Sequence, residues 1–171
     1  MRLYTLLLTL PLLLLCGCAV PLKGHEMMAR TQIYDSLDAP RLEKKISLGN
    51  VDVVKGLGGS APVIPEEYRA ALELSLRQAG WYATPEHSSY TLDAQMLTIE
   101  QPFIGFDFTV KATAKYSLRK SGDVVYQETL ILPCTVRFAE SLNAEIRLRK
   151  ATACSVGENI AHLLKVLSED F

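Results

Sequence analysis

The chain has 171 residues, of which 49% are hydrophobic and 22% charged, and this composition predicts one globular domain with an ordinary core. Eighteen basic and 19 acidic side chains leave a formal net charge of −1. This balance argues against a nucleic-acid-binding protein, which normally carries a clear basic excess.

Residues 1–17 have the three-part pattern of a secretory signal. Arg2 gives a positive start, an almost unbroken apolar run extends over residues 3–15, and a small residue precedes Cys18. The alternative is an uncleaved transmembrane helix, but the uncharged stretch barely reaches the roughly 20 residues that a bilayer requires, and Pro11 interrupts it. We therefore predict an exported protein whose signal peptide is removed.

The segment Leu15-Cys16-Gly17-Cys18 resembles the lipobox of bacterial lipoproteins. In that family the signal is cut before a cysteine, whose thiol receives a diacylglycerol and whose new amine is acylated. The resemblance implies that Cys18 is the lipid-modified N-terminus, because large Leu15 precedes the other candidate, Cys16. Ala19 after the modified cysteine, rather than aspartate, implies sorting to the outer membrane, with the protein at its periplasmic face. Two or three acyl chains would hold the protein firmly at a bilayer.

Residues 18–44 are predicted to be the lipidated N-terminus and a tether. Pro21, Gly24 and Pro40 interrupt this segment, and it shows no sustained hydrophobic period. Residues 31–34 within it are predicted as a short edge strand. A single α+β domain is then expected over residues 45–171.

The domain is predicted to begin with a strand, a loop and a helix. Residues 46–54 alternate and include β-branched side chains, which is typical of a strand. The glycine-rich loop at residues 56–65 lacks the Gly-Lys-Ser/Thr that ends a phosphate-binding loop. Pro65 suits the first position of a helix, and Gly80 suits its end. The apolar stripe of this helix predicts a core-facing element, formed by Tyr68, Ala71, Leu72, Leu76 and Ala79.

Three more strands and a second helix follow. The strands begin near Tyr90, Phe108 and Val124, and alternation along residues 108–119 indicates one buried and one wet face. The final helix carries an apolar stripe between Ile146 and Leu167. The predicted fold class is α+β: a two-layer sandwich in which two helices cover one face of an antiparallel sheet of about four strands, in the order β-α-β-β-β-α.

The turn at residues 103–106 is the candidate interface. Its sequence, Phe103-Ile104-Gly105-Phe106, is apolar, and an apolar tip can anchor a partner or enter lipid. The competing interpretation, which we favour, is that both phenylalanines fold back over the end of the core. Leu97, Ile99 and Ile131 are predicted to add apolar side chains to an otherwise polar sheet face. There they either extend a binding patch or are covered by the N-terminal segment.

Cys134 and Cys154 remain after modification of Cys18, and a disulfide between them is one alternative in an oxidising compartment. It would close a ~20-residue loop and add roughly 3 kcal/mol of stability. However, Cys134 is predicted to face the core, whereas Cys154 lies about 120° from the apolar stripe of its helix. This geometry favours two separate thiols.

No combination of residues in the sequence predicts catalysis or metal binding. His25, His87 and His162 lie in unrelated segments without a spacing that suits a metal site or a catalytic base. Ser75 has no neighbouring histidine or acid that could activate it. We therefore expect no enzymatic activity, no cofactor and no metal ion.

Several segments resemble a family of small, poorly characterised bacterial lipoproteins. The matching segments are Glu67-Tyr68-Arg69-Ala70-Ala71-Leu72, Tyr90-Thr91-Leu92-Asp93-Ala94, Gln101-Pro102-Phe103-Ile104-Gly105-Phe106-Asp107, Gly58-Gly59, Leu74-Ser75-Leu76 and Asn159-Ile160-Ala161. More loosely, the order of elements is similar to that of the auxiliary lipoproteins of lipid-transport ABC systems. Some members carry an acyltransferase label, but enzymes of that name are built from hexapeptide repeats, which this sequence lacks. The family has no settled function to transfer.

Together these features predict a non-catalytic, membrane-anchored lipoprotein of the periplasm that binds or assembles with a component of the cell envelope, protein or lipid. Its membrane partner is engaged through the acyl chains on Cys18. The alternatives are an accessory subunit of a lipid or glycolipid ABC-type transport system and, with less support, a hydrolase or acyltransferase.

Overall fold

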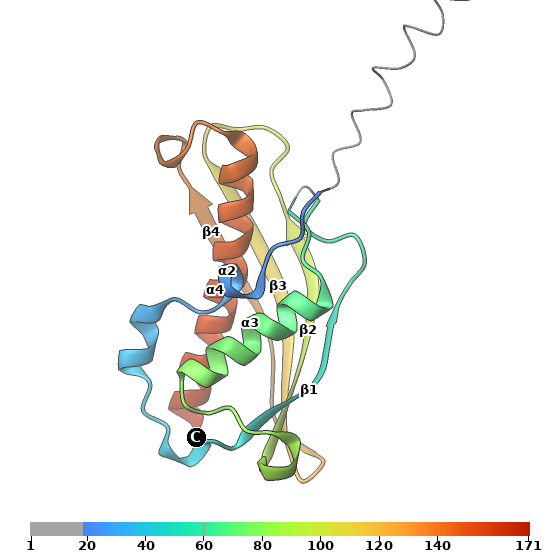
Figure 1. Ribbon diagram of the computed structural model, residues 1–171, viewed down its shortest axis with the longest axis vertical. Helices are drawn as coiled ribbons and strands as arrows, with labels where there is room; N and C mark the ends of the chain where they lie inside the picture. The colour runs from blue at the N-terminus through green and yellow to red at the C-terminus, as the bar shows by residue number, and fades with distance from the viewer. Residues whose placement is uncertain (1–18, 60) are drawn as a thin grey trace, which may run out of the picture.

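The computed structural model describes residues 19–59 and 61–171. The predicted signal at residues 1–17 and the predicted acylation site Cys18 lie outside the described residues. Within the described part of the chain, no helix has both the length and the hydropathy needed to cross a membrane. The chain forms a four-stranded sheet with helices on one face (Figure 1), and this confirms the predicted α+β two-layer class.

The strands lie side by side in the order β1-β2-β3-β4. Their bounds are β1 Ile46–Val53, β2 Tyr90–Glu100, β3 Phe108–Lys120 and β4 Asp123–Val136. The last three form the predicted antiparallel meander. In contrast to the predicted antiparallel sheet, β1 runs parallel to β2. The reason is that the helix between them, α3 (Pro65–Gln78), carries the chain back to the end of the sheet where β1 began.

The second long helix, α4 (Ala144–Asp170), lies along β3 and β4 on the same face as α3 (Figure 1). Its approach is close because the inward residues Ala112 and Ala114 of β3 are small, and both are fully buried. The Asn159 amide donates to the Ala112 carbonyl at 3.0 Å, and the Ser155 hydroxyl donates to the Leu132 carbonyl at 2.6 Å. The backbone of the two strands thus accepts hydrogen bonds from the Asn159 amide N–H and the Ser155 hydroxyl, two buried donors of the helix.

The N-terminal segment differs from the predicted tether. Leu22, Met27 and Leu42 are each 0% exposed, and the short helix α2 (Gly24–Met27) packs across α3 and α4. Gly157 of α4 permits this crossing, because a Cβ there would lie 2.9 Å from the Met28 carbonyl oxygen. The buried apolar residues of the segment join the main core cluster, but they are irregularly spaced in the sequence, so the segment shows no hydrophobic period although it belongs to the fold.

Short 3₁₀ helices fill the connections: η2 (Thr31–Ser36), η3 (Pro40–Leu42), η4 (Pro85–His87) and η5 (Phe138–Glu140). The first of these replaces the predicted edge strand at residues 31–34.

Cys134 of β4 and Cys154 of α4 form a disulfide, with their Cα atoms 5.8 Å apart. The structure therefore differs from the preference for two separate thiols. Because β4 is the edge strand and α4 lies above β3 and β4, the flank of the helix, rather than its apolar stripe, meets the edge of the sheet. Both cysteines lie on this flank and are only half-buried.

Candidate functional site

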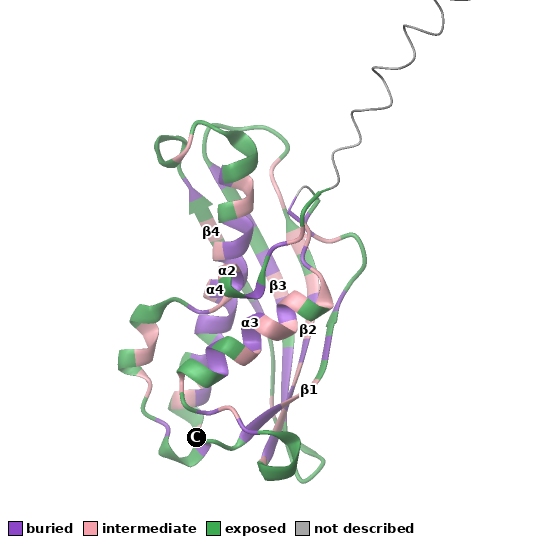
Figure 2. Ribbon diagram, in the orientation of Figure 1, coloured by how far each residue is buried: buried purple, intermediate pink, exposed green. Residues whose placement is uncertain are grey.

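The loop between β2 and β3 projects from one end of the molecule. The exposed fractions of Phe103, Ile104 and Phe106 are 103%, 91% and 78%, so all three side chains point into solvent. This end of the molecule is largely coloured as exposed in Figure 2. The interpretation that both phenylalanines fold back over the core is therefore wrong.

Both ends of this loop are fixed, although its tip is exposed. The Gln101 side-chain amide donates to the Gly58 carbonyl at 3.0 Å and to the Thr152 hydroxyl at 2.9 Å. On the other side, the Asp107 carboxylate accepts a hydrogen bond from the Phe138 backbone N–H at 2.8 Å. Hydrogen bonds thus fix the base of the loop, while its apolar tip projects into solvent.

A second loop, between β4 and α4, adds apolar groups beside the first. Phe138 is 40% exposed and Leu142 is 80% exposed. The Phe138 ring meets the Phe106 ring edge-on at a centroid distance of 5.7 Å. The buried Arg147 places its guanidinium 4.9 Å from the centre of the Phe138 ring and donates to the Ser141 carbonyl at 2.5 Å. These contacts join the two loops into one unit.

We call the five exposed side chains of the two loops the apolar end. Its members are Phe103, Ile104, Phe106, Phe138 and Leu142. Sequence reasoning found the first three and missed the last two. The available signal was the isolated apolar Leu142 in a polar connection, which nothing in the periodic pattern required.

The described chain begins at the same end of the molecule. Arg149, in the second turn of α4, donates to the carbonyl oxygens of Val20 and Pro21 at 2.8 and 3.1 Å. The Leu22 N–H donates to the Pro62 carbonyl at 2.9 Å, next to the loop that holds Gln101. In Figure 1 this start and the two apolar loops lie toward the upper end of the view.

The other predicted members of the interface are placed elsewhere. A register shift between Met96 and Thr98 makes Leu97 a bulge residue, and Ile99 then faces the helices opposite Ala112. Ile99 packs against the core and does not extend the patch. Leu97 is half-buried, and Ile131, 60% exposed, pairs with Thr113 on the open face of the sheet.

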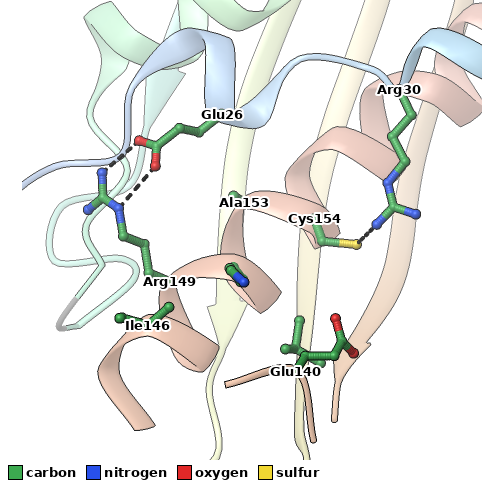
Figure 3. Close-up of a pocket in the computed structure, with 9 residues that line it drawn as sticks. Glu26, Arg30, Glu140, Ile146, Arg149, Ala153 and Cys154 are labelled. Carbon is green, nitrogen blue, oxygen red and sulfur yellow. Dashed lines mark hydrogen bonds and ion pairs between the residues drawn. The ribbon is translucent and has the colours of Figure 1, made fainter. Parts of the chain in front are cut away.

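A groove of about 510 Å³ lies between α2, the start of α4 and the end of β4 (Figure 3). The Arg149 guanidinium pairs with Glu26 across it, at 2.6 Å. Burial alone would raise the pKa of Glu26, but the hydrogen bonds from Arg149 and from the Lys23 backbone outweigh it and lower this pKa below its ordinary value. Arg30, on the other side, pairs with Glu158 at 3.2 Å. The two arginines that line this groove, Arg149 and Arg30, are thus each paired with a glutamate of the protein.

The polar residues considered for catalysis have structural contacts. Ser75 is fully buried, donates to the Ala71 carbonyl at 2.7 Å and accepts from the Ala29 N–H at 3.0 Å. His87 contacts the Thr84 hydroxyl at 3.1 Å, and His162 is exposed on α4. Over residues 19–59 and 61–171, no cluster of three or more histidine, cysteine, aspartate or glutamate side chains could hold a metal ion.

Two tyrosines with strongly raised pKa values lie in the core. The hydroxyls of Tyr68 and Tyr116 are 2.9 Å apart, both residues are fully buried, and burial raises the pKa of both phenols well above the ordinary value. They stay neutral and satisfy one another's hydrogen bonds, which is a structural role. Together with Met96 they fill the space between sheet and helices, so the lipid-transport alternative would require this core to open.

Comparison with known proteins identifies the fold. No protein-family model matches the sequence, and no curated protein matches it. A protein of the DUF330 family from Xanthomonas campestris superposes with a TM-score of 0.56 at 11% identity, covering 77% of this chain and 91% of that one. The minor lipoprotein of Acinetobacter baumannii gives a TM-score of 0.51 at 10% identity over 75% and 94% of the two chains.

A hypothetical protein from Chlamydia trachomatis gives a TM-score of 0.53 at 10% identity, covering 74% of this chain and 96% of that one. At such identities the likeness establishes a shared architecture and leaves function to be argued from the residues of this chain.

Proposed function

We propose that the protein is a non-catalytic lipoprotein, acylated at Cys18, whose domain binds a component of the cell envelope at a membrane surface. The observation that carries the proposal is the short distance between the lipobox and the fold. Three residues separate Cys18 from the buried Leu22, and they span at most about 14 Å when extended. An acylated Cys18 therefore holds the folded domain directly against the bilayer.

The absence of catalysis in this proposal is supported by the contacts of the reactive side chains. Cys134 and Cys154 are joined to each other, and Ser75 is buried within the helical layer. Ala19 supports a location in the outer membrane, at its periplasmic face, by the sorting pattern of lipoproteins. The exposed apolar end supports a binding role, because large clustered apolar side chains at a surface mark contact sites.

The proposal is tested by substituting the acylated residue. We expect the wild-type chain to incorporate a labelled palmitate analogue and to run at the size of a protein that begins at Cys18. Cys18→Ser should abolish the label and leave the larger precursor, because a hydroxyl cannot replace the thiol in this modification. Mass spectrometry of the N-terminal peptide identifies the modified residue.

Cys16→Ser is the matched control, since it removes a thiol two positions away and should leave labelling and size unchanged. Equal labelling and trimming in Cys18→Ser would overturn the proposal.

A further inference from the structure

We infer that the apolar end inserts into the same lipid leaflet that holds the acyl anchor, so that the domain stands on the membrane by this end. The inference rests on the proposed acylation of Cys18 and names the lipid bilayer as the component that the apolar end contacts.

The first argument is where the exposed aromatic side chains gather. Among the described residues, the exposed phenylalanines are Phe103, Phe106 and Phe138, and all three belong to the apolar end. Val124 and Val125, beside the hairpin at the opposite end, are exposed apolar residues of smaller size. The two ends are separated by the length of β3, 13 residues or on the order of 40 Å. Of the two ends of the domain, the apolar end is therefore the one whose exposed side chains favour insertion into lipid.

The second argument is where the chain leads. Arg149 fixes the backbone of Val20 and Pro21 beside the start of α4, and Gln101 ties the Phe103 loop to both α4 and Gly58. The residue that would carry the acyl chains is thus next to a segment held at the apolar end. A protein anchored to the bilayer at this point already has both apolar loops close to the lipid. A protein partner would first have to diffuse to them.

The third argument is the shape of the tip. Phe103 and Ile104 are almost completely exposed and project from a loop, and neither lines the groove between α2, α4 and β4. A projecting apolar tip requires no complementary surface to enter lipid, and interfacial elements are typically buried about 5–10 Å into the headgroup and acyl boundary. A protein partner would instead need a pocket shaped to these side chains.

Charge supports insertion driven by apolar contact rather than by anionic headgroups. Lys111 and Glu100, at the base of the first loop, pair with each other at 3.8 Å, and the second loop carries both Arg137 and Glu140, whose carboxylate accepts a hydrogen bond from the Arg137 backbone N–H at 2.9 Å. Charges of both signs therefore surround the apolar end, and contact with lipid should persist at high salt.

The test places a fluorescent probe at the tip of the acylated, full-length mature protein. Phe103→Trp is reconstituted into phosphatidylcholine vesicles with and without brominated acyl chains. We expect a blue-shifted emission and a loss of about half of the added fluorescence with brominated lipid, because the quencher acts only at the insertion depth of interfacial elements. The native Trp81 is 3% exposed and provides a constant background.

Val125→Trp, at the opposite end and 43% exposed in the native residue, is the matched control and should show no quenching. If Phe103→Trp floats with the vesicles but keeps a solvent-exposed emission, the insertion is wrong and the acyl anchor stands. A blue shift without quenching means that the tip is buried in protein instead, which also overturns the inference. Failure to float with vesicles overturns the anchor and the insertion together.

Discussion

Two turns connect the antiparallel strands of the sheet, one at each end, and they differ in length, composition and exposure. Ser121 and Gly122 join β3 to β4 by a two-residue turn, because Lys120 pairs with Asp123. Both residues have positive φ, 52° and 94°, as tight hairpins require. The connection from β2 to β3 instead uses residues 101–107 and exposes Phe103, Ile104 and Phe106.

The difference indicates that the β3–β4 turn only reverses the chain, whereas the β2–β3 loop also provides a contact surface. The hairpin contains only what the backbone needs: a residue that tolerates positive φ and a glycine. The longer loop carries large apolar side chains that no connection between strands requires and that tend to promote association in water. The residues that hold its base, Gln101 and Asp107, show that the loop is positioned rather than loose.

The largest effect is expected where the start of the chain joins the apolar end. Leu22→Ala should lower the free energy of unfolding by about 2–5 kcal/mol, because it leaves a cavity at a fully buried position. Urea denaturation of the purified protein measures this change. Val20→Ala, two residues earlier and 62% exposed, should stay within about 0.5 kcal/mol of wild type. Equal effects of the two substitutions would mean that the segment is a tether after all.

A smaller effect is expected at the hairpin. Gly122→Ala should cost about 1 kcal/mol, because an L-residue is strained at positive φ. Its added Cβ meets no atom within 4 Å, so the loss is conformational and not steric. Gly122→Asn should recover part of the stability, since asparagine tolerates this conformation. A thermal melt that ranks the two variants the other way would remove the geometric explanation of this turn.

The sequence predicts elements well where the contacts are periodic. Alternation along β3 identified the buried face that ends at Leu118, and the stripe of α3 identified Tyr68 and Leu72 as core residues. These patterns are visible because each element presents many side chains to one neighbour. The same pattern fixed the two-layer class.

The failures occur where one contact depends on the placement of two elements. The bulge at Leu97 reverses the direction of Ile99, and a period-two pattern cannot reveal a single inserted residue. The disulfide between Cys134 and Cys154 depends on how α4 is rotated and shifted over the edge strand. The apolar end was only partly predicted for the same reason, because Phe138 joins Phe106 through a contact between two loops that are distant in the sequence.

The smallest effect on stability is expected at the tip itself, and it is the most informative. The double substitution Phe103→Ser and Ile104→Ser should leave the free energy of unfolding within about 0.5 kcal/mol of wild type. Both side chains are almost fully exposed in the folded protein, so unfolding changes their surroundings little. Phe108→Ser is the matched control: the same residue type at the base of the same loop is 6% exposed and should cost about 3–5 kcal/mol. If the tip variant unfolds as easily as the Phe108 variant, the long loop is a structural element like the hairpin, and the contrast between the two ends fails. If the tip variant is as stable as wild type but the acylated domain loses its fixed orientation on vesicles, the apolar residues of the tip contribute to membrane contact and not to folding.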